Sequence, residues 1–322
     1  MERLFPLLYA ASLLLPEIAM PTPVSTIATS APPAVSLPSE RIQNIVSRAV
    51  TGTLEKFTAR DLQSNQVAVT LIDLSDPSAP THGSYRGEEQ VYPASVIKLF
   101  YLVAAHHWME QGQMQDTEEL RRAMRDMIVD SYNEATGYIV DLLTGTTSGP
   151  ELSAGEMAVW YEKRNAVNRY FSSLGYQKIN VNRKPWCEGP YGREMQSTRM
   201  HAPNHRNWLT TDATARLMTE IVLGKAVTTR RCAEMMELLK REPFGDGNRN
   251  AQASSYTGAG LPQGARLWSK AGWTSQTRHD AAYVELPGGP KFVLVVFTVD
   301  HANEREIIPS LTREVVQGLT LK

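Results

Sequence analysis

The sequence predicts a mixed α/β fold, in which a mainly antiparallel sheet is flanked by terminal helices and carries an inserted all-helical lobe. Three observations predict it. Strand-like runs lie near the beginning and again at the end of the chain, a block of amphipathic helices separates them, and helical periodicity precedes the first run and follows the last. Because an isolated strand pair is marginally stable, the early and late strands must join in one sheet.

The first α/β elements begin at residue 39. Ile42, Ile45, Val46 and Val50 recur at helical spacing behind Ser39, which is a favourable N-cap residue. Residues 66–74 alternate in polarity and are rich in β-branched side chains, which predicts a strand. A second short strand is expected over residues 84–87. These elements and residues 245–322 form the predicted α/β lobe, which comprises residues 39–93 and 245–322.

Residues 94–244 form the predicted helical lobe. The expected helices cover residues 95–111, 118–129, 134–143, 157–174, 211–223 and 229–240. Residues 180–207 hold three prolines and several glycines without periodicity, which predicts a long loop. Long ordered loops are uncommon unless they are functional, so this loop is expected to border the site.

The last part of the chain returns to strands. They are expected over residues 265–272, 281–286 and 291–299, with a Pro-Gly-Gly turn at residues 287–289 between the last two. The run 292–299 is almost continuously apolar, as in a central strand. An amphipathic helix over residues 307–319 closes the chain.

The start of the chain resembles an export signal. Residues 1–20 contain a short apolar run that is too short to span a membrane, and residues 21–38 are a linker rich in Pro, Ser, Thr and Ala. We therefore expect an exported protein, periplasmic or secreted, without stable membrane insertion. The net charge of −1, from 33 basic and 34 acidic residues, argues against a nucleic-acid partner. We expect a monomer.

Two cysteines, Cys187 and Cys232, are present. They form either a disulfide or two separate buried thiols, and the sequence alone does not decide between these two possibilities. They form no metal motif, and no phosphate-binding or dinucleotide-binding glycine loop occurs. We therefore expect no metal and no cofactor.

One tetrapeptide contains a candidate nucleophile and a candidate base. Ser95-Val96-Ile97-Lys98 is the only Ser-x-x-Lys in the chain, and it opens a predicted helix. Residues three apart share a helix face, so the hydroxyl and the amine can approach each other. A lysine whose pKa is lowered by burial and nearby positive charge can accept the serine proton. The alternative is a helix-capping serine beside a solvated lysine.

Two further elements follow in order. Ser131-Tyr132-Asn133 lies at a helix junction, where a second hydroxyl can relay a proton and an amide can hold a substrate carbonyl. Lys270 ends a predicted strand, and Gly272 beside it allows a substrate backbone to approach closely. A helix cap, an exposed edge lysine and a turn glycine are the alternatives.

Together these elements resemble the S-x-x-K, S-D-N and K-T-G motifs of class A β-lactamases and penicillin-interacting enzymes. The chain has S-V-I-K, S-Y-N and K-A-G in the same order, and the resemblance covers residues 40–322. It implies acylation of Ser95, with Lys98 as base or relay and Ser131 as proton donor to the leaving nitrogen. It also implies an oxyanion hole from the N–H groups of Ser95 and Trp273. The remaining implied substrate-binding residues are Asn133, Lys270, Gly272 and Thr274.

The chain departs from the family in several places. Ala271 stands where a hydroxyl that binds a substrate carboxylate is usual, and Thr274 or Arg278 could substitute. The first two motifs are closer together than usual, and an extra stretch occupies residues 146–162. Class A enzymes carry a deacylating glutamate in a Glu-x-x-x-Asn pattern, and the corresponding loop here, residues 182–207, contains no such pattern. Glu188 is the preferred candidate for that role and Glu194 the second, and either could instead be a solvated loop residue.

The resemblance implies a serine hydrolase that forms an acyl-enzyme and hydrolyses β-lactams. A D-alanyl-D-alanine peptidase, transpeptidase or esterase of the same fold is the alternative enzyme. A third hypothesis is an inactive module that binds peptidoglycan peptides. Asp300-His301 suggests a catalytic dyad, but no Gly-x-Ser-x-Gly elbow accompanies it.

Overall fold

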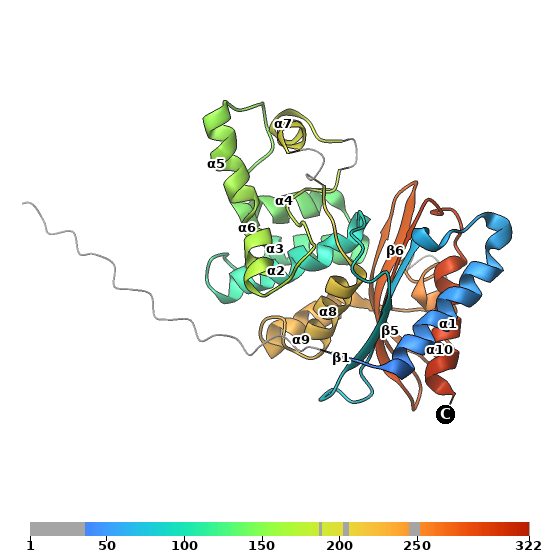
Figure 1. Cartoon of the computed structure of the whole chain (residues 1–322). Helices are drawn as coiled ribbons and strands as arrows, with labels where there is room; N and C mark the ends of the chain where they lie inside the picture. Colours follow the sequence, from blue (N-terminus) through green and yellow to red (C-terminus); the bar gives the residue numbers. More distant parts are fainter. Residues whose placement is uncertain (1–35, 187–188, 202–205, 245–251, 322) are drawn as a thin grey trace, which may run out of the picture. The chain divides into compact units, whose positions relative to one another are not determined.

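The computed structural model describes residues 36–186, 189–201, 206–244 and 252–321 (Figure 1). The predicted signal peptide at residues 1–20 and the linker up to residue 35 lie outside the described residues. The last residues of the predicted linker form a short strand, β1 (Leu37–Pro38), which pairs with β3. Among the helices described, none is both long enough and apolar enough to cross a membrane.

A seven-stranded sheet in the order β1-β3-β2-β7-β6-β5-β4 confirms the predicted fold class. All neighbouring strands are antiparallel except the pair β1 and β3. The early strand β2 lies between β3 and β7, so the beginning and the end of the chain do join in one sheet. The other strands are β2 (Val67–Asp73), β3 (Thr81–Tyr85), β4 (Lys240–Arg241), β5 (Arg266–Trp273), β6 (Thr277–Glu285) and β7 (Lys291–Val299).

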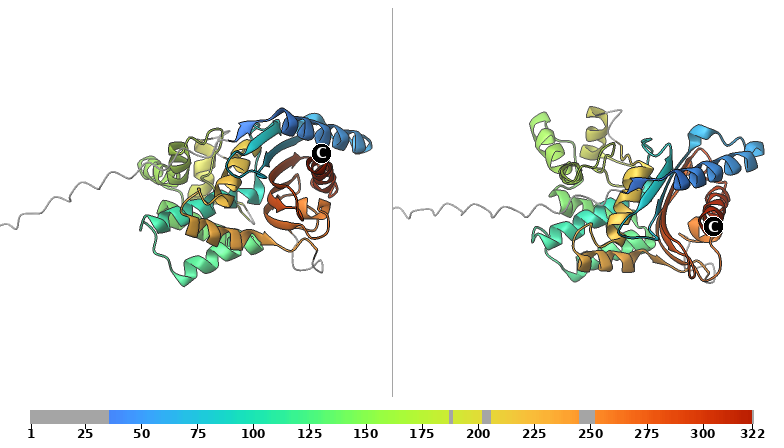
Figure 2. Two further views of the ribbon diagram at one scale, coloured as in Figure 1. Left: turned by 90° about the horizontal axis from the view of Figure 1, so that it is seen from below. Right: turned by 60° about the horizontal axis from the view of Figure 1, so that its bottom comes forward.

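The two terminal helices pack together on one face of the sheet. They are α1 (Glu40–Lys56) and α10 (Ile307–Thr320), and they lie side by side in both views of Figure 2. Their apolar faces and one face of the sheet share a core that includes Ile42, Leu294 and Leu311, all completely buried. Burial of one stripe of each helix is what an amphipathic pattern predicts.

The helical part covers the chain between β3 and β4. Its central helix, α2 (Lys98–Glu110), is buried on nearly every side, and α8 (Thr211–Val222) contacts β2, β6 and β7. A short 3₁₀ turn, η3 (Ala94–Ile97), leads into α2, and a π-helical turn, η4 (Asp126–Asp130), follows α3. The other helices are α3 (Glu118–Arg125), α4 (Asn133–Thr144), α5 (Ala154–Arg164), α6 (Ala166–Ser173), α7 (Gly192–Met200) and α9 (Thr229–Leu239).

The predicted helix over residues 157–174 is two helices. Helix α5 begins earlier, at a capping box in which Ser153 and Glu156 exchange hydrogen bonds with each other's backbone. It ends at Asn165, whose side-chain amide donates to Tyr161 O at 2.9 Å and accepts from Asn168 and Asn182. The side chain of Asn165 thus hydrogen-bonds to α5, to α6 and to Asn182, and the regular helix is interrupted at this residue before α6 begins.

The predicted loop over residues 180–207 contains helix α7, which was not predicted. Its buried face is polar: Glu194 and Ser197 are 2% and 0% exposed. Apolar periodicity therefore gives no signal for this helix, although it packs against the helical part.

Burial of His106 predicts acid sensitivity. The side chain is 2% exposed, and among the described residues neither ring nitrogen has a hydrogen-bond partner. Burial lowers its pKa to about 4, against the opposing charge of Glu234. The unfolded chain therefore takes up a proton below about pH 6.5 while the folded chain does not, so stability falls as the pH drops toward 4.

We expect the wild type to lose about 2 kcal/mol of stability through His106 between pH 7 and pH 5, and His106→Leu to abolish that part of the loss. Urea unfolding of both proteins at the two pH values measures the difference. An equal loss in wild type and variant would show that His106 is not responsible.

Candidate active site

Ser95 lies in the turn η3 at the entrance to α2. His279 of β6 is completely buried and hydrogen-bonds to the chain just before this turn. Its Nδ1 accepts from the N–H of Thr298 at 3.1 Å, so its Nε2–H donates to Tyr92 O at 2.9 Å. Burial lowers the pKa of His279 to about 4, which keeps the ring neutral at pH 7. His279 therefore holds the chain three residues before Ser95, and no motif in the sequence indicates this.

Lys98 reaches the second motif. It is completely buried, and its Nζ donates to Ser131 O at 2.6 Å and to Asn133 Oδ1 at 2.8 Å. The same nitrogen lies 3.3 Å from Ser131 Oγ. Ser131 follows η4 in the left-handed region at φ 60°, a conformation uncommon for a residue with a side chain. That turn presents both its carbonyl and its hydroxyl to the lysine.

Lys270 reaches the same hydroxyl from β5. Its completely buried Nζ donates to Ser131 Oγ at 2.9 Å, to Gln252 Oε1 at 2.8 Å and to Ala271 O at 2.7 Å. Burial lowers the pKa of Lys270 well below its usual value, and the charges of Lys98 and Arg241 lower it further. One hydroxyl therefore lies between two amines from distant parts of the chain.

The free edge of β5 faces the Ser95 turn. Thr274 N–H donates to Thr277 O at 2.9 Å, so these two residues form a hydrogen-bonded pair of the antiparallel ladder. Such pairs alternate with non-bonded ones, and Trp273 therefore directs its N–H away from β6. The same alternation directs the N–H and C=O of Ala271 to Gln252 and Lys270. The Trp273 N–H is thus free of the ladder.

Gly272 brings the first and third motifs into contact. A Cβ on this residue would lie 2.7 Å from Pro93 O and 3.0 Å from Ser95 N. Both atoms belong to the backbone, so the strand and the turn can pack this closely only where no side chain intervenes. The sequence-predicted glycine therefore fixes where the Ser95 N–H lies relative to β5.

Gln252 and Asp280 support Lys270, and sequence reasoning missed both. Gln252 Nε2 donates to the carbonyl oxygens of Ile128 at 3.1 Å and Val129 at 2.7 Å, so its amide connects η4 to β5. Asp280 on β6 is completely buried and accepts from Thr257 N at 3.1 Å. Burial raises its pKa to about 6, while the charges of Arg241 and Lys270 oppose the rise.

The structure brings some of the predicted residues together and leaves others apart. Glu188 and Cys187 lie outside the described residues, and Cys232 is a free buried thiol. The hydroxyl of Thr274 accepts from the N–H groups of Gln276 and Thr277, both at 3.1 Å, within its own turn. It is therefore already engaged in the hairpin.

The alternative substitute for the missing hydroxyl of Ala271 is also engaged. Arg278 donates to Ala302 O at 2.9 Å and to Ser255 Oγ at 3.2 Å, and it stacks on Tyr256. Its guanidinium is thus held by residues other than those of the three motifs.

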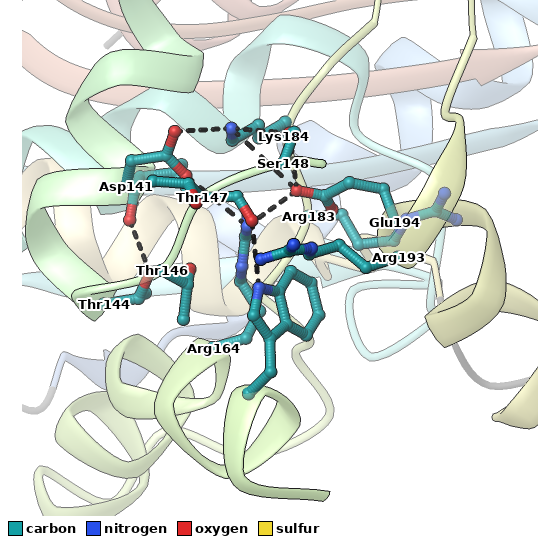
Figure 3. Close-up of polar contacts among 12 residues, drawn as sticks. Asp141, Thr144, Thr146, Thr147, Ser148, Arg164, Arg183, Lys184, Arg193 and Glu194 are labelled. Atoms are coloured by element: carbon teal, nitrogen blue, oxygen red, sulfur yellow. Dashed lines mark hydrogen bonds and ion pairs between the residues drawn. The ribbon is translucent and has the colours of Figure 1, made fainter. Parts of the chain in front are cut away.

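Glu194, the second candidate for the deacylating carboxylate, is held in a buried network of the helical part (Figure 3). It accepts from Arg164 Nη2 at 2.7 Å and from Ser148 Oγ at 3.0 Å. Lys184 Nζ also enters this network, at 2.6 Å from Asp141 Oδ2 and 3.9 Å from Glu194 Oε1. These partners occupy the carboxylate, which argues against Glu194 as a base.

No group of three or more potential metal ligands occurs in the described ranges.

Comparisons with known proteins identify the family and the fold. The model of a family described as the beta-lactamase enzyme family matches residues 53–319. The fold is similar to that of a β-lactamase from Sphaerobacter thermophilus DSM 20745, with a TM-score of 0.63 and 20% identity over 87% of this chain and 98% of that one.

Two other solved structures show the same similarity. A point mutant of PBP-A, in an acyl-enzyme complex with penicillin G, has a TM-score of 0.61 and 20% identity, over 89% of this chain and 98% of that one. TLA-3 extended-spectrum β-lactamase has a TM-score of 0.63 and 13% identity, over 87% and 100% of the two chains. A search of curated protein sequences found no significant match.

Proposed function

This chain belongs to the beta-lactamase enzyme family, and on that premise we propose that it acylates Ser95 and hydrolyses β-lactams. The observation that carries the proposal is the position of Ser131 Oγ, 3.3 Å from Lys98 Nζ and 2.9 Å from Lys270 Nζ. Gly272 brings strand β5, which carries Lys270, against the backbone of Ser95, and we infer that the Ser95 hydroxyl faces the same groove.

Acylation transfers one proton through these groups. Ser95 Oγ attacks the lactam carbonyl carbon, and its proton passes to Lys98 Nζ, which acts as the base. The lactam C–N bond then breaks, and Ser131 Oγ–H gives its proton to the leaving nitrogen, while Lys98 Nζ, 3.3 Å away, passes to Ser131 the proton that it took from Ser95. Lys270, which donates to the same hydroxyl at 2.9 Å, holds Ser131 in position for this relay.

Two backbone N–H groups are the proposed hydrogen-bond donors to the negative charge that develops on the carbonyl oxygen. The N–H of Ser95 lies at the start of a helical turn, and the N–H of Trp273 points away from the sheet ladder. Removing one such donor costs about 3 kcal/mol of transition-state stabilisation in other hydrolases. We assign the substrate carboxylate to the Lys270 side of the site and the acyl side chain to Asn133.

Deacylation needs a base that positions a water molecule, and we propose Glu188 for this role. The engagement of Glu194 by Arg164 and Ser148 favours this choice between the two glutamates. If Glu188 does not act, the acyl-enzyme persists, and the protein behaves as a penicillin-binding peptidase, transpeptidase or esterase. An inactive peptide-binding module is the outcome if Ser95 is not acylated at all.

A chromogenic cephalosporin tests the proposal with purified wild type, Ser95→Ala and Glu188→Gln. We expect turnover by the wild type, none by Ser95→Ala, and accumulation of acyl-enzyme in Glu188→Gln. Stable acylation without turnover of the wild type would favour the peptidase. Hydrolysis by Ser95→Ala at the wild-type rate would show that Ser95 is not the nucleophile. Unchanged turnover by Glu188→Gln would show that another residue is the deacylation base.

A further inference from the structure

A small pocket of about 170 Å³ lies between the segment before Ser95 and the chain around residues 183–207. Its lining combines aromatic rings with positive charge, and among the described residues it contains no carboxylate. The lining residues are Tyr92, Arg183, Lys184, Trp186, Arg206 and Asn207.

Several lining groups are hydrogen-bond donors that the fold does not use. The indole N–H of Trp186 is buried, and within the described ranges it has no hydrogen-bond partner. The guanidinium of Arg206 stacks on the rings of Tyr92 and Trp208, at 4.9 and 5.7 Å, and has no carboxylate partner among the described residues. A buried donor without an acceptor is costly, so a ligand that supplies an acceptor to the indole N–H is favoured here. Arg206 is exposed, and its guanidinium adds positive charge at the rim of the pocket.

The remaining groups make the pocket rigid. Asn207 accepts from the N–H groups of Asn182 and Arg183, at 3.3 and 3.0 Å, and donates to Arg183 O at 2.8 Å. Lys184 donates to Asp141 and Ser148, so its charge is balanced by the network behind the pocket. The wall is therefore formed before a ligand arrives.

The pocket adjoins the second motif. Asn133 Nδ2 donates to Trp186 O at 3.3 Å, and Asn133 Oδ1 accepts from Lys98 at 2.8 Å. One asparagine thus separates the pocket wall from the buried lysine of the site. The volume of about 170 Å³ is enough for a short acidic group.

We propose that this pocket binds a carboxylate on the acyl side chain of the substrate, with Arg206 and the Trp186 indole N–H as its principal donors. The inference rests on the proposed acylation of Ser95, and it names the preferred substrates as β-lactams whose acyl side chain carries a carboxylate. The described lining offers cations and neutral donors with no carboxylate opposite them, which favours an anion, and the aromatic rings fit the carbon atoms next to it.

Benzylpenicillin and its α-carboxy derivative differ by one side-chain carboxylate and therefore form a matched pair of substrates. We would measure second-order rate constants for acylation of wild type, Arg206→Gln, Arg206→Lys and Trp186→Phe by mass spectrometry. Trp186→Phe keeps the ring and removes the N–H, and Arg206→Lys keeps the charge. Arg60→Gln, an exposed arginine on the α/β part paired with Glu304, is the control.

We expect the ratio of carboxylated to uncarboxylated rate constants to fall about tenfold in Arg206→Gln and to fall less in Arg206→Lys. Trp186→Phe should lower the ratio as well, and Arg60→Gln should leave it unchanged. Acylation by both compounds with an unchanged ratio in Arg206→Gln and Trp186→Phe would overturn the inference alone. If neither compound acylated the wild type, the proposed function itself would be overturned, and this inference with it.

Discussion

Replacing Lys98 by alanine should lower the rate constant for acylation of Ser95 by about 10²- to 10⁴-fold, the usual contribution of a positioned acid–base group. The reason is geometric as well as chemical. Lys98 is completely buried and is hydrogen-bonded to Ser131 O and Asn133 Oδ1, so its loss removes the proton acceptor and takes a hydrogen-bond donor from both of these oxygens. Quenched-flow mass spectrometry with benzylpenicillin measures the rate constant.

Lys98→Arg separates charge from proton transfer in this experiment. Arginine carries a positive charge but does not lose its proton in proteins, so it cannot accept the serine proton, and we expect acylation as slow as in Lys98→Ala. Lys56→Ala is the matched lysine control, because Lys56 lies on α1 and donates to Ser310. Acylation of Lys98→Arg at close to the wild-type rate would show that Lys98 supplies charge alone.

Gly272→Ala should lower the acylation rate constant about 100-fold, since small displacements of reacting groups have effects of this size. The new methyl would meet Pro93 O and Ser95 N at 2.7 and 3.0 Å, and neither backbone atom can move without shifting the nucleophile's turn. We also expect a loss of about 1–3 kcal/mol in unfolding free energy from overpacking. Acylation kinetics and urea unfolding measure the two effects.

Gly155→Ala is the control for this substitution. Gly155 lies in the first turn of α5, and a Cβ there meets no atom within 4 Å. Alanine should therefore stabilise the helix slightly, by about 0.5–1 kcal/mol, and leave acylation unchanged. If Gly272→Ala acylated as fast as the wild type, the close contact between β5 and the Ser95 turn would not matter for catalysis.

Much of the fold could be predicted because apolar spacing decides it. The run at 292–299 became the buried strand β7, and the stripe of Ile42, Ile45 and Val46 became the core face of α1. Helix α7 could not be found in this way, because its buried residues Glu194 and Ser197 are polar, and Glu194 is held by partners far away in sequence.

The residues of the candidate site also fall into those that the sequence could predict and those that it could not. Ser95, Lys98, Ser131 and Lys270 could be proposed because each belongs to a short motif with its own chemistry. Gln252 and His279 belong to no motif. Each acts by joining backbone groups of two distant segments, Gln252 between η4 and β5 and His279 between β7 and the chain at Tyr92. Such contacts exist only after folding.

Peptide mapping of acid-quenched reactions with benzylpenicillin tests the central claim most directly, with Glu188→Gln included because its acyl-enzyme is expected to accumulate. The account predicts a penicilloyl adduct of the intact drug's mass, located on the tryptic peptide that contains Ser95 and absent from Ser95→Ala. An adduct on any other residue, or equal labelling of wild type and Ser95→Ala, would contradict the assignment of the nucleophile.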